Sequence, residues 1–400
     1  RPEAGRAHPP ISRRLAGTGG ARPPPLRSRA RPVDLLTRRP LVPALAVVAA
    51  LVWGYGALDP VAFAEAGVKY YGPMADAAPG LDLGQNQPYV FRWLGPWLAG
   101  LLPLAVPTAF YVWAVVGSLA LAALAYAVCR ADGATAGASA LAVVLLAANP
   151  YLFGFNVFNM YQLGDLLAQL GLGAGLWLLW RRQYLGLGAV LAATVLAREP
   201  AILMVPVAAV YLWEQQRLRE DGWKLALALV PVVVLFAVPR ALLSGQEGPH
   251  LVQTFLNASG KAADPGTWAR LLVNAWVPVV AVLAVFPRET AAWVRGHLHL
   301  AALFGLTLAS AFFGGDQERL MQPAIWAVYP AVAAVLAARW PLRSGATAVL
   351  LAAAALTSLH HITARFPLPD RALTAVLAAV ALALALAAAV WVRRRPAPAG

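Results

Sequence analysis

Two acids and an arginine interrupt the apolar sequence near residue 316. The stretch "FFGGDQERLMQP", residues 312–323, places Asp316, Glu318 and Arg319 between two hydrophobic runs. A charge at membrane depth costs on the order of 3 kcal/mol unless it is paired or faces a watery cavity, so it indicates a functional site. Arginine and carboxylate side chains together can bind an anion and transfer a proton. The alternative is a buried charge pair that braces two helices.

A second charged pair lies in the middle of residues 184–213. As one helix this segment is about 45 Å long, which is too long for one crossing without steep tilt. Its centre is Arg198-Glu199-Pro200, and proline breaks a helix. The segment is therefore predicted to form a hairpin of two short helices with the Arg198-Glu199 tip below the membrane surface. The alternative is a self-satisfied pair that tolerates a short hairpin.

The segment 59–104 is the longest between two apolar runs and carries further polar chemistry. Its part "RWLGPWLAGLLPL" is apolar but short and interrupted by proline, which predicts a helix at the membrane interface. The following stretch "NPYLFGFNVFNMYQLGD" leads through polar side chains to Asp165. The candidate residues of 59–104 are Asp59, Glu65, Tyr70, Tyr71, Asp76 and Arg92.

Composition shows which elements must position these residues. Sixty per cent of the 400 residues are hydrophobic and 12% are charged, outside the range of soluble domains. This predicts an all-α, polytopic transmembrane helical bundle. The net charge of +14 does not indicate a nucleic-acid partner, because the basic residues form short clusters between apolar runs. The predicted spans are 41–58, 105–129, 134–153, 162–180, the two arms of 184–213, 224–243, 270–287, 297–313, 321–338, 345–363 and 372–392.

The positive-inside rule favours the hairpin. With it the chain crosses about twelve times, and, excluding the ten arginines of the tail 1–40, 13 basic residues lie inside and nine outside. A single span would leave nine inside and twelve outside. The prediction is a multi-pass protein of the cytoplasmic membrane with both termini cytoplasmic. Its parts are a disordered Arg/Pro-rich tail (1–40), the transmembrane domain (41–395) with its first outer loop (59–104), and a short tail (396–400).

Motifs of other chemistries are missing from the sequence. It has no phosphate-binding loop ending in Lys-Ser/Thr, no His-Glu-x-x-His and no Gly-x-Ser-x-Gly. Cys129 is the one cysteine, and His360-His361 has no acidic neighbour in sequence that would complete a metal site. No metal ligands are predicted.

Four features in this order resemble the type C (GT-C) integral-membrane glycosyltransferases. They are an arginine-flanked first span before a long acidic outer loop, "PYVFRWLGPWLA" closing that loop, "AREP" at a hairpin tip, and "GGDQERLMQPAIWAVYP" opening a late span. The resemblance covers roughly residues 41–340. It implies transfer of a hexose or pentose, for example mannose, from a polyprenyl-phosphate donor to a lipid, glycan or protein acceptor at the outer face of the membrane.

The resemblance also implies roles for the candidate residues. Arginines hold the lipid phosphate while a carboxylate takes the proton of the acceptor hydroxyl. Asp59, just after the first span, is the favoured base over Glu65 and Asp76. An inverting displacement requires no cofactor, and use of a divalent metal stays open. The predicted substrate-binding residues are Arg92, Arg198 and Arg319 for phosphate, Glu199, Asp316, Glu318 and Asp165 for orientation or sugar hydroxyls, and Tyr70 and Tyr71 for the sugar ring.

Two other functions fit a bundle of this size. A secondary transporter would gather its charges near the midplane around broken helices, often in two related halves. A non-catalytic component of an envelope-assembly complex would tolerate loss of single acids. Charges at the outer span ends and the lack of an internal repeat favour the transferase.

Overall fold

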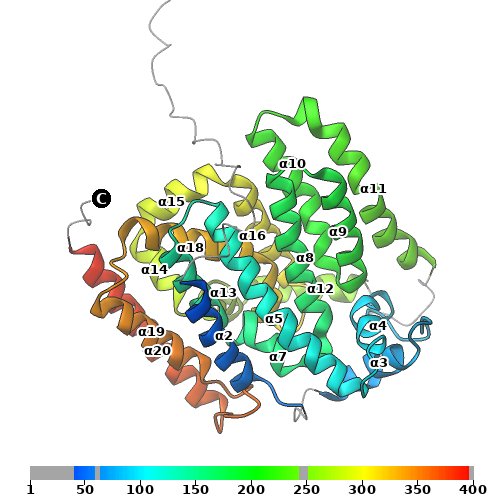
Figure 1. The fold of residues 1–400 in the computed structure, drawn as a ribbon, viewed down its shortest axis with the longest axis horizontal. Helices are drawn as coiled ribbons and strands as arrows, with labels where there is room; N and C mark the ends of the chain where they lie inside the picture. The colour runs from blue at the N-terminus through cyan, green and yellow to red at the C-terminus, as the bar shows by residue number, and fades with distance from the viewer. Residues whose placement is uncertain (1–39, 59–63, 243–250, 396–400) are drawn as a thin grey trace, which may run out of the picture.

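The computed structural model describes residues 40–58, 64–242 and 251–395, and every regular element within them is a helix (Figure 1). The all-α prediction is confirmed for this part of the chain. The predicted tails 1–40 and 396–400 lie outside the described residues, apart from Pro40.

The helices follow one another with short connections. The α-helices are α2 (Leu41–Tyr55), α3 (Ala64–Asp76), α4 (Leu94–Gly100), α5 (Val106–Ala131), α6 (Ala136–Ala147), α7 (Phe155–Phe158), α8 (Leu163–Trp180), α9 (Tyr184–Ala197), α10 (Met204–Glu214), α11 (Leu218–Leu242), α12 (Leu251–Ala263), α13 (Pro265–Leu272), α14 (Val279–Val285), α15 (Pro287–Gly296), α16 (Leu298–Ala311), α17 (Gln317–Leu320), α18 (Ile325–Arg339), α19 (Gly345–Ser358) and α20 (Arg371–Arg393). Short 3₁₀ or π turns are η1 (Tyr89–Phe91), η2 (Pro150–Gly154), η3 (Met160–Gln162), η4 (Glu199–Leu203), η5 (Asn274–Trp276) and η6 (Gln322–Ala324).

Several of these helices are long and apolar enough to cross a membrane. By length and composition four qualify among the described residues, or up to six if each of two bent pairs counts as one span. The bends are 73° between α6 and the η2–α7 segment and 97° between the α13–η5 segment and α14. Four more apolar helices are shorter, at 10–17 residues. These helices indicate a membrane protein, and the count of twelve spans stays a prediction.

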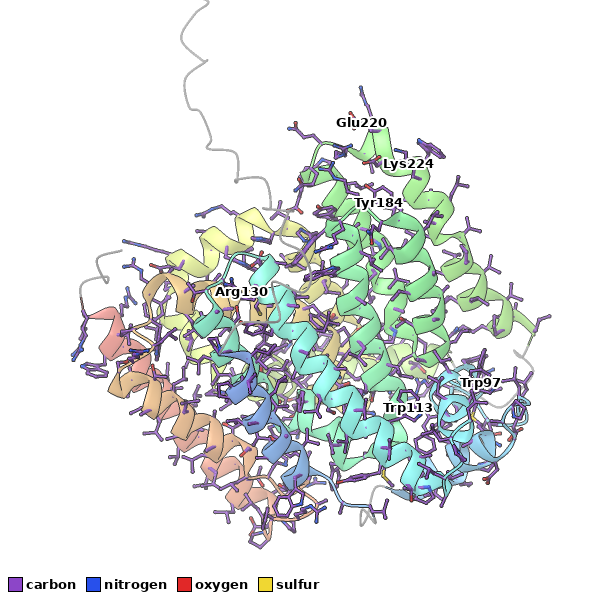
Figure 2. The ribbon with its side chains drawn as sticks, viewed as in Figure 1. Trp97, Trp113, Arg130, Tyr184, Glu220 and Lys224 are labelled. Carbon is purple, nitrogen blue, oxygen red and sulfur yellow. The ribbon has the colours of Figure 1, made fainter. Side chains whose placement is uncertain are left out.

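The ends of three helices show that the loops gather at two opposite ends of the bundle. At one end Trp180 closes α8, and its indole N–H donates to Nε2 of His299 at 3.1 Å. The Nδ1 atom of His299, near the start of α16, lies 2.5 Å from Oε2 of Glu214 at the end of α10. At the other end lie the first turn of α8 and the segments that precede α10 and follow α16. Figure 2 shows Tyr184, Glu220 and Lys224 together at the first end, far from Trp97.

The segment 184–213 turns back on itself as the sequence predicted. The Tyr184 hydroxyl, at the start of α9, donates to Oδ2 of Asp221 at 3.0 Å, although α10 intervenes. The chain therefore descends through α9, reverses at Arg198-Glu199 and returns through α10. α9 packs between α8 and α11, whereas α10 packs against α16. The main packing partner therefore differs between the two arms, although α10 also contacts α11 and α8.

Glycine allows the helices of this region to approach closely. A Cβ atom on Gly171 of α8 would lie 1.8 Å from Oγ1 of Thr194 in α9. A Cβ atom on Gly188 of α9 would lie 2.0 Å from the carbonyl oxygen of Ala228 in α11. Small residues at such crossings are typical of helices packed in membranes. They hold α9 close to α8 on one side and to α11 on the other.

The described part of the first loop, residues 64–104, folds as a small helical unit beside the end of the bundle where α8 begins. α3 packs on α4, and α4 packs on α5 (Figure 1). The indole of Trp97 donates to the carbonyl of Pro79 at 3.1 Å, and that of Trp113 donates to the carbonyl of Leu98 at 3.1 Å. The predicted interfacial segment is therefore helical at α4, and it is anchored by tryptophans on both sides.

Candidate functional site

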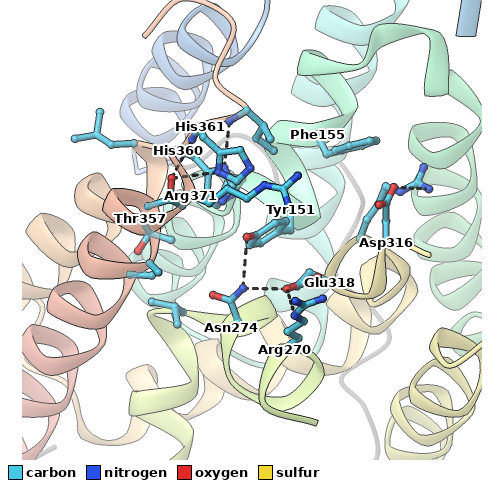
Figure 3. Close-up of a pocket in the computed structure, with 18 of the residues that line it drawn as sticks. Tyr151, Phe155, Arg270, Asn274, Asp316, Glu318, Thr357, His360, His361 and Arg371 are labelled. Atoms are coloured by element: carbon cyan, nitrogen blue, oxygen red, sulfur yellow. Dashed lines mark hydrogen bonds and ion pairs between the residues drawn. The ribbon is translucent and has the colours of Figure 1, made fainter. Parts of the chain in front are cut away.

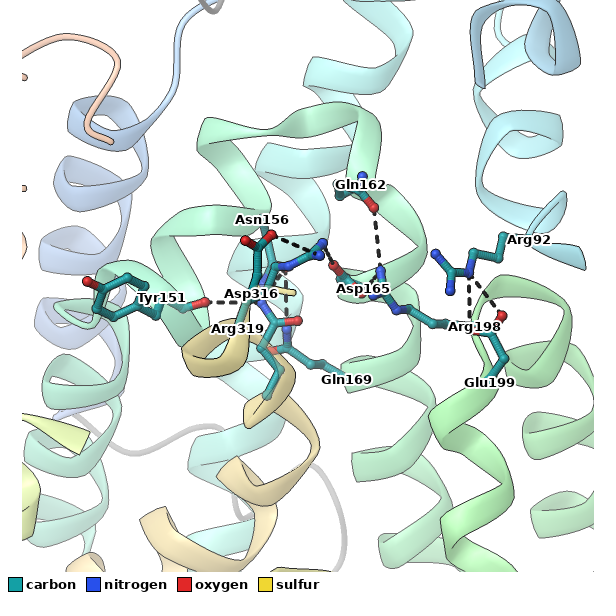
Figure 4. Close-up of polar contacts among 11 residues, drawn as sticks. Arg92, Tyr151, Asn156, Gln162, Asp165, Gln169, Arg198, Glu199, Asp316 and Arg319 are labelled. Atoms are coloured by element: carbon teal, nitrogen blue, oxygen red, sulfur yellow. Dashed lines mark hydrogen bonds and ion pairs between the residues drawn. The ribbon is translucent and has the colours of Figure 1, made fainter. Parts of the chain in front are cut away.

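Asp165 is the centre of the charged cluster. Its side chain, in the first turn of α8, is only 4% exposed. One carboxylate oxygen pairs with Nη1 of Arg198 at the hairpin tip, and the other accepts from Nη1 of Arg319 at 3.0 Å (Figure 4). Three segments far apart in sequence are thereby joined through one buried carboxylate. The pairing satisfies charges that would otherwise be costly at this depth.

Arg319 connects this buried centre to a more open surface. Its second terminal nitrogen, Nη2, lies 3.1 Å from Oδ2 of Asp316, whose side chain is 58% exposed. The guanidinium carbon lies 4.8 Å from the centre of the Phe155 ring, a distance typical of a cation–π contact. Arg319 and Asp316 therefore form one network with Asp165. This network extends from the buried carboxylate of Asp165 to the exposed carboxylate of Asp316.

Glu199 gathers a second pair of arginines on the other side of the hairpin tip. The Nε atom of Arg92 donates to both of its carboxylate oxygens, at 3.0 and 3.1 Å. Nη2 of Arg240 lies 3.3 Å from Oε1, and the Arg240 guanidinium also covers the ring of Phe91 at 4.6 Å. The tip of the hairpin is thus held to the first loop and to the end of α11.

A cavity of about 310 Å³ opens next to Arg319 at the same end of the bundle (Figure 3). Helices α13, α17, α19 and α20 and the turn η2 contribute to its wall. Its charged residues are Arg270, Asp316, Glu318, Arg319 and Arg371. Its apolar wall includes Leu356, Leu359, Ile362, Ala375 and Ala378 from the α19–α20 region. Cations, carboxylates and an apolar surface thus meet in one hollow.

Glu318 is held inside this cavity by neutral and charged donors. The amide of Asn274 donates to its Oε1 at 3.1 Å and also approaches the Tyr151 hydroxyl at 3.4 Å. Nε of Arg270 lies 4.0 Å from the same carboxylate, at the limit of an ion pair, and the Arg270 side chain is 64% exposed. Arg270 is therefore weakly held and accessible to an anion in the cavity.

Two histidines form another part of the wall, in the loop between α19 and α20. The rings of His360 and His361 stack with centres 4.3 Å apart, and the Tyr151 ring meets His360 edge-on at 4.8 Å. Within the described ranges, no group of three or more His, Cys, Asp or Glu side chains is placed to hold a metal ion.

The structure brings most of the predicted binding residues to one end of the molecule. Arg92, Asp165, Arg198, Glu199, Asp316, Glu318 and Arg319 all join the contacts described above. Tyr71 is buried and its hydroxyl is hydrogen-bonded to Arg92, while Tyr70 stacks on Tyr89 with ring centres 4.0 Å apart. Both tyrosines therefore contribute to the packing of the first loop, and sugar stacking by them stays a prediction.

Of the three predicted catalytic acids, the structure describes the side chain of only one, Asp76. Asp59 lies outside the described residues, and Glu65 stands in the first turn of α3 with its side chain outside them. Asp76 is exposed at the C-terminal end of α3. The role of these three acids stays a prediction from the sequence.

Several residues of the site were missed by reasoning from the sequence. The charge count places Arg240, Arg270 and Arg371 on the outer side, but none of them belongs to a motif that points to a binding site. Tyr151 and Asn274 are single polar residues among apolar neighbours. Only the fold brings these side chains to Glu199 and to the cavity.

The chemistry of the arrangement is that of an anion site with an accessible carboxylate. Three arginines line the cavity. It also has two acids, Asp316 and Glu318, and the side chain of Asp316 is the more exposed of the two. No protein-family model, curated protein or solved structure matches this chain.

Proposed function

We propose that this protein is a membrane glycosyltransferase. It moves a sugar from a polyprenyl-phosphate donor to a hydroxyl of a lipid, glycan or protein acceptor at the outer face of the cytoplasmic membrane, using a GT-C-like bundle of about twelve spans. The observation that supports this best is the cavity of about 310 Å³ in which three arginines and two carboxylates adjoin an apolar wall. A lipid-linked phosphate presents the complementary groups.

The arginines suit the leaving group of such a reaction. When the bond between the sugar carbon and the phosphate oxygen breaks, the lipid phosphate gains negative charge, which guanidinium groups stabilise. Arg270 and Arg371 line the cavity from α13 and α20, and Arg319 lines it from α17. Arg198 and Arg92 pair with Asp165 and Glu199 and do not line the cavity, so we assign them to positioning of the site.

A carboxylate must accept the proton of the attacking hydroxyl as the new carbon–oxygen bond forms. Asp59 remains the first candidate, because it follows the first span directly. Asp316 is the second, because its side chain is 58% exposed and it lines the cavity.

The position of the charges favours a transferase over a transporter. Asp165 lies in the first turn of α8, Arg198 directly follows α9, and Arg319 lies in the short helix after α16. These positions lie at the end of the bundle opposite Glu214 and His299, whereas transporters bind their substrates near the bilayer midplane.

The test is transfer of labelled sugar in membranes that contain the full chain. Membranes are incubated with labelled polyprenyl-phosphate sugars, and labelled lipid and glycan products are separated and counted. Arg270→Gln with Arg371→Gln removes two accessible cavity cations and is expected to weaken donor binding about tenfold or more. Arg365→Gln is the matched control, because Arg365 contacts Trp53 at the same end without lining the cavity.

Two outcomes would contradict the proposal. One is a lack of transfer from every polyprenyl-phosphate sugar tested, with folded protein present. The other is equal donor binding by the cavity variant and the Arg365→Gln control.

A further inference from the structure

A second charged cavity lies at the opposite end of the bundle. It has a volume of about 220 Å³ and is lined by Arg288, Glu289, Arg339, Arg393 and Arg395 together with apolar residues. Four arginines against one glutamate leave three uncompensated positive charges in a small hollow. This cavity is remote from Asp165 and takes no part in the proposed transfer.

Segments far apart in sequence build this cavity. Arg288 and Glu289 lie in the first turn of α15, Arg339 is the last residue of α18, Arg393 is the last residue of α20, and Arg395 follows it by two positions. Figure 1 shows the C-terminal end of α20 beside α14. Nη1 of Arg393 donates to the carbonyl of Val285 at 3.1 Å, which fastens α20 to the end of α14. The arginines are therefore held around one space by the fold.

The single acid of the cavity is already paired. Both Nε and Nη2 of Arg339 lie 2.5 Å from Oε1 of Glu289, so these two charges largely cancel. Arg288, Arg393 and Arg395 remain as the positive groups that face the cavity. Their mutual repulsion disfavours this arrangement unless an anion is bound between them.

The surroundings of the cavity suit a lipid. The guanidinium of Arg395 covers the indole of Trp391 at 4.0 Å, and Trp391 is among the exposed large residues. Tryptophan with arginine is typical of the headgroup level of a bilayer. Further along α20, Val380, Leu386 and Val390 are also exposed. A basic hollow thus adjoins an apolar helix surface on which acyl chains can lie.

Topology signalling alone does not explain this geometry. A positive-inside signal requires basic residues near span ends, but it does not require four of them to converge from three helices on one hollow. By the charge count this end of the bundle carries 13 basic residues and faces the cytoplasm. The cytoplasmic leaflet is rich in anionic lipids, and basic pockets between helices bind their headgroups.

We propose that this second cavity binds the phosphate of an anionic phospholipid headgroup from the inner leaflet. Its positive groups hold the phosphate oxygens, and the exposed face of α20 contacts the acyl chains. The proposal does not depend on the glycosyltransferase activity, since the two cavities lie at opposite ends of the molecule.

The experiment compares lipid binding by the purified full chain in native mass spectrometry and in nanodiscs. The probes are phosphatidylglycerol, phosphatidylcholine and inorganic phosphate. Arg288→Gln with Arg395→Gln removes two cavity charges, whereas Arg343→Gln with Arg394→Gln removes two charges at the same end that do not line the cavity. Thermal unfolding of each variant reports whether it is folded.

The expected result is selective binding of phosphatidylglycerol by the natural chain, and an affinity about 25-fold lower in the cavity variant, or about fivefold for each arginine. The control variant should bind within about twofold of the natural chain. Equal losses in both variants would mean general surface attraction and would overturn the proposal. Binding of inorganic phosphate without preference for phosphatidylglycerol would also overturn it, because the ligand would then be a free anion.

Discussion

Removing the carboxylate of Asp165 is the sharpest test of the charged cluster. Asp165→Asn keeps the size of the side chain but withdraws the negative charge shared by Arg198 and Arg319. Arg319 would keep its ion pair with Asp316. Arg198, whose side chain is 7% exposed, would keep only a neutral acceptor, because Oε1 of Gln162 lies 3.4 Å from Nη1 of Arg198. Breaking a buried pair at one partner costs about 3–5 kcal/mol. The free energy of unfolding should fall by that amount.

Thermal unfolding of the purified protein in detergent measures this cost. At about 2.1 cal/mol/K of unfolding entropy per residue, a chain of 400 residues loses roughly 1.2 °C of Tm per kcal/mol, so about 3–5 kcal/mol corresponds to a fall in Tm of roughly 4–6 °C. Asp76→Asn serves as the control, because Asp76 is exposed at the end of α3. Its change in stability should stay within about 0.5 kcal/mol.

A double variant separates lost charge from lost packing. Asp165→Asn with Arg198→Met removes both the buried carboxylate and its closer arginine partner, leaving an apolar side chain of similar length. Such replacement is often neutral, so the double variant should be more stable than Asp165→Asn alone by about 2 kcal/mol or more. A natural Tm for Asp165→Asn, or a double variant no more stable than the single one, would refute the role given to Asp165.

Three further predictions concern the donor, the base and the topology. Arg319→Lys keeps the charge but loses the planar guanidinium that contacts both Asp165 and Asp316. This variant should fold, yet bind polyprenyl-phosphate sugar about tenfold less tightly in a filter or fluorescence assay. An unchanged affinity would mean that Arg319 only braces the helices. Asp59→Asn should bind donor normally while turnover in the membrane assay falls by about 10²-fold or more, and a natural rate would move the base to Glu65, Asp76 or Asp316. After replacement of Cys129, a cysteine at Gly222 should be shielded from impermeant reagent in intact cells and one at Gly248 should be labelled; the reverse pattern would contradict the predicted sidedness.

Local sequence determines the helices of this protein. Apolar runs of about 20 residues must satisfy their backbone groups internally in a membrane, and a helix does so within one segment. The residues that end helices also act through the local sequence. Pro200 follows a charged pair, and the helix α9 ends three residues before it, at Ala197. The hairpin was therefore predictable from length, proline and charge count together.

Bends within single apolar runs were not predictable in this way. The predicted spans 134–153 and 270–287 each hold two helical pieces, at 73° and 97° to each other. A run of apolar residues favours helix at every position, so hydropathy does not determine where the axis turns. Asn149, which caps η2 by accepting from the N–H groups of Tyr151 and Leu152, is a local mark of the first bend. It is recognisable only when the packing is known.

The pairing of charges was decided by the tertiary structure alone. The sequence shows that Asp165, Arg198 and Arg319 stand at span ends on one predicted side, and it therefore indicates a common site. Which carboxylate meets which arginine depends on helix crossings set by side-chain packing, including the close approach at Gly171 and Gly188. The same packing brings Arg240 to Glu199, Arg270 and Arg371 to the cavity next to Arg319, and four arginines to the second cavity. Ion pairs act over a few ångströms in space, and residues more than a hundred positions apart reach that distance only through the fold.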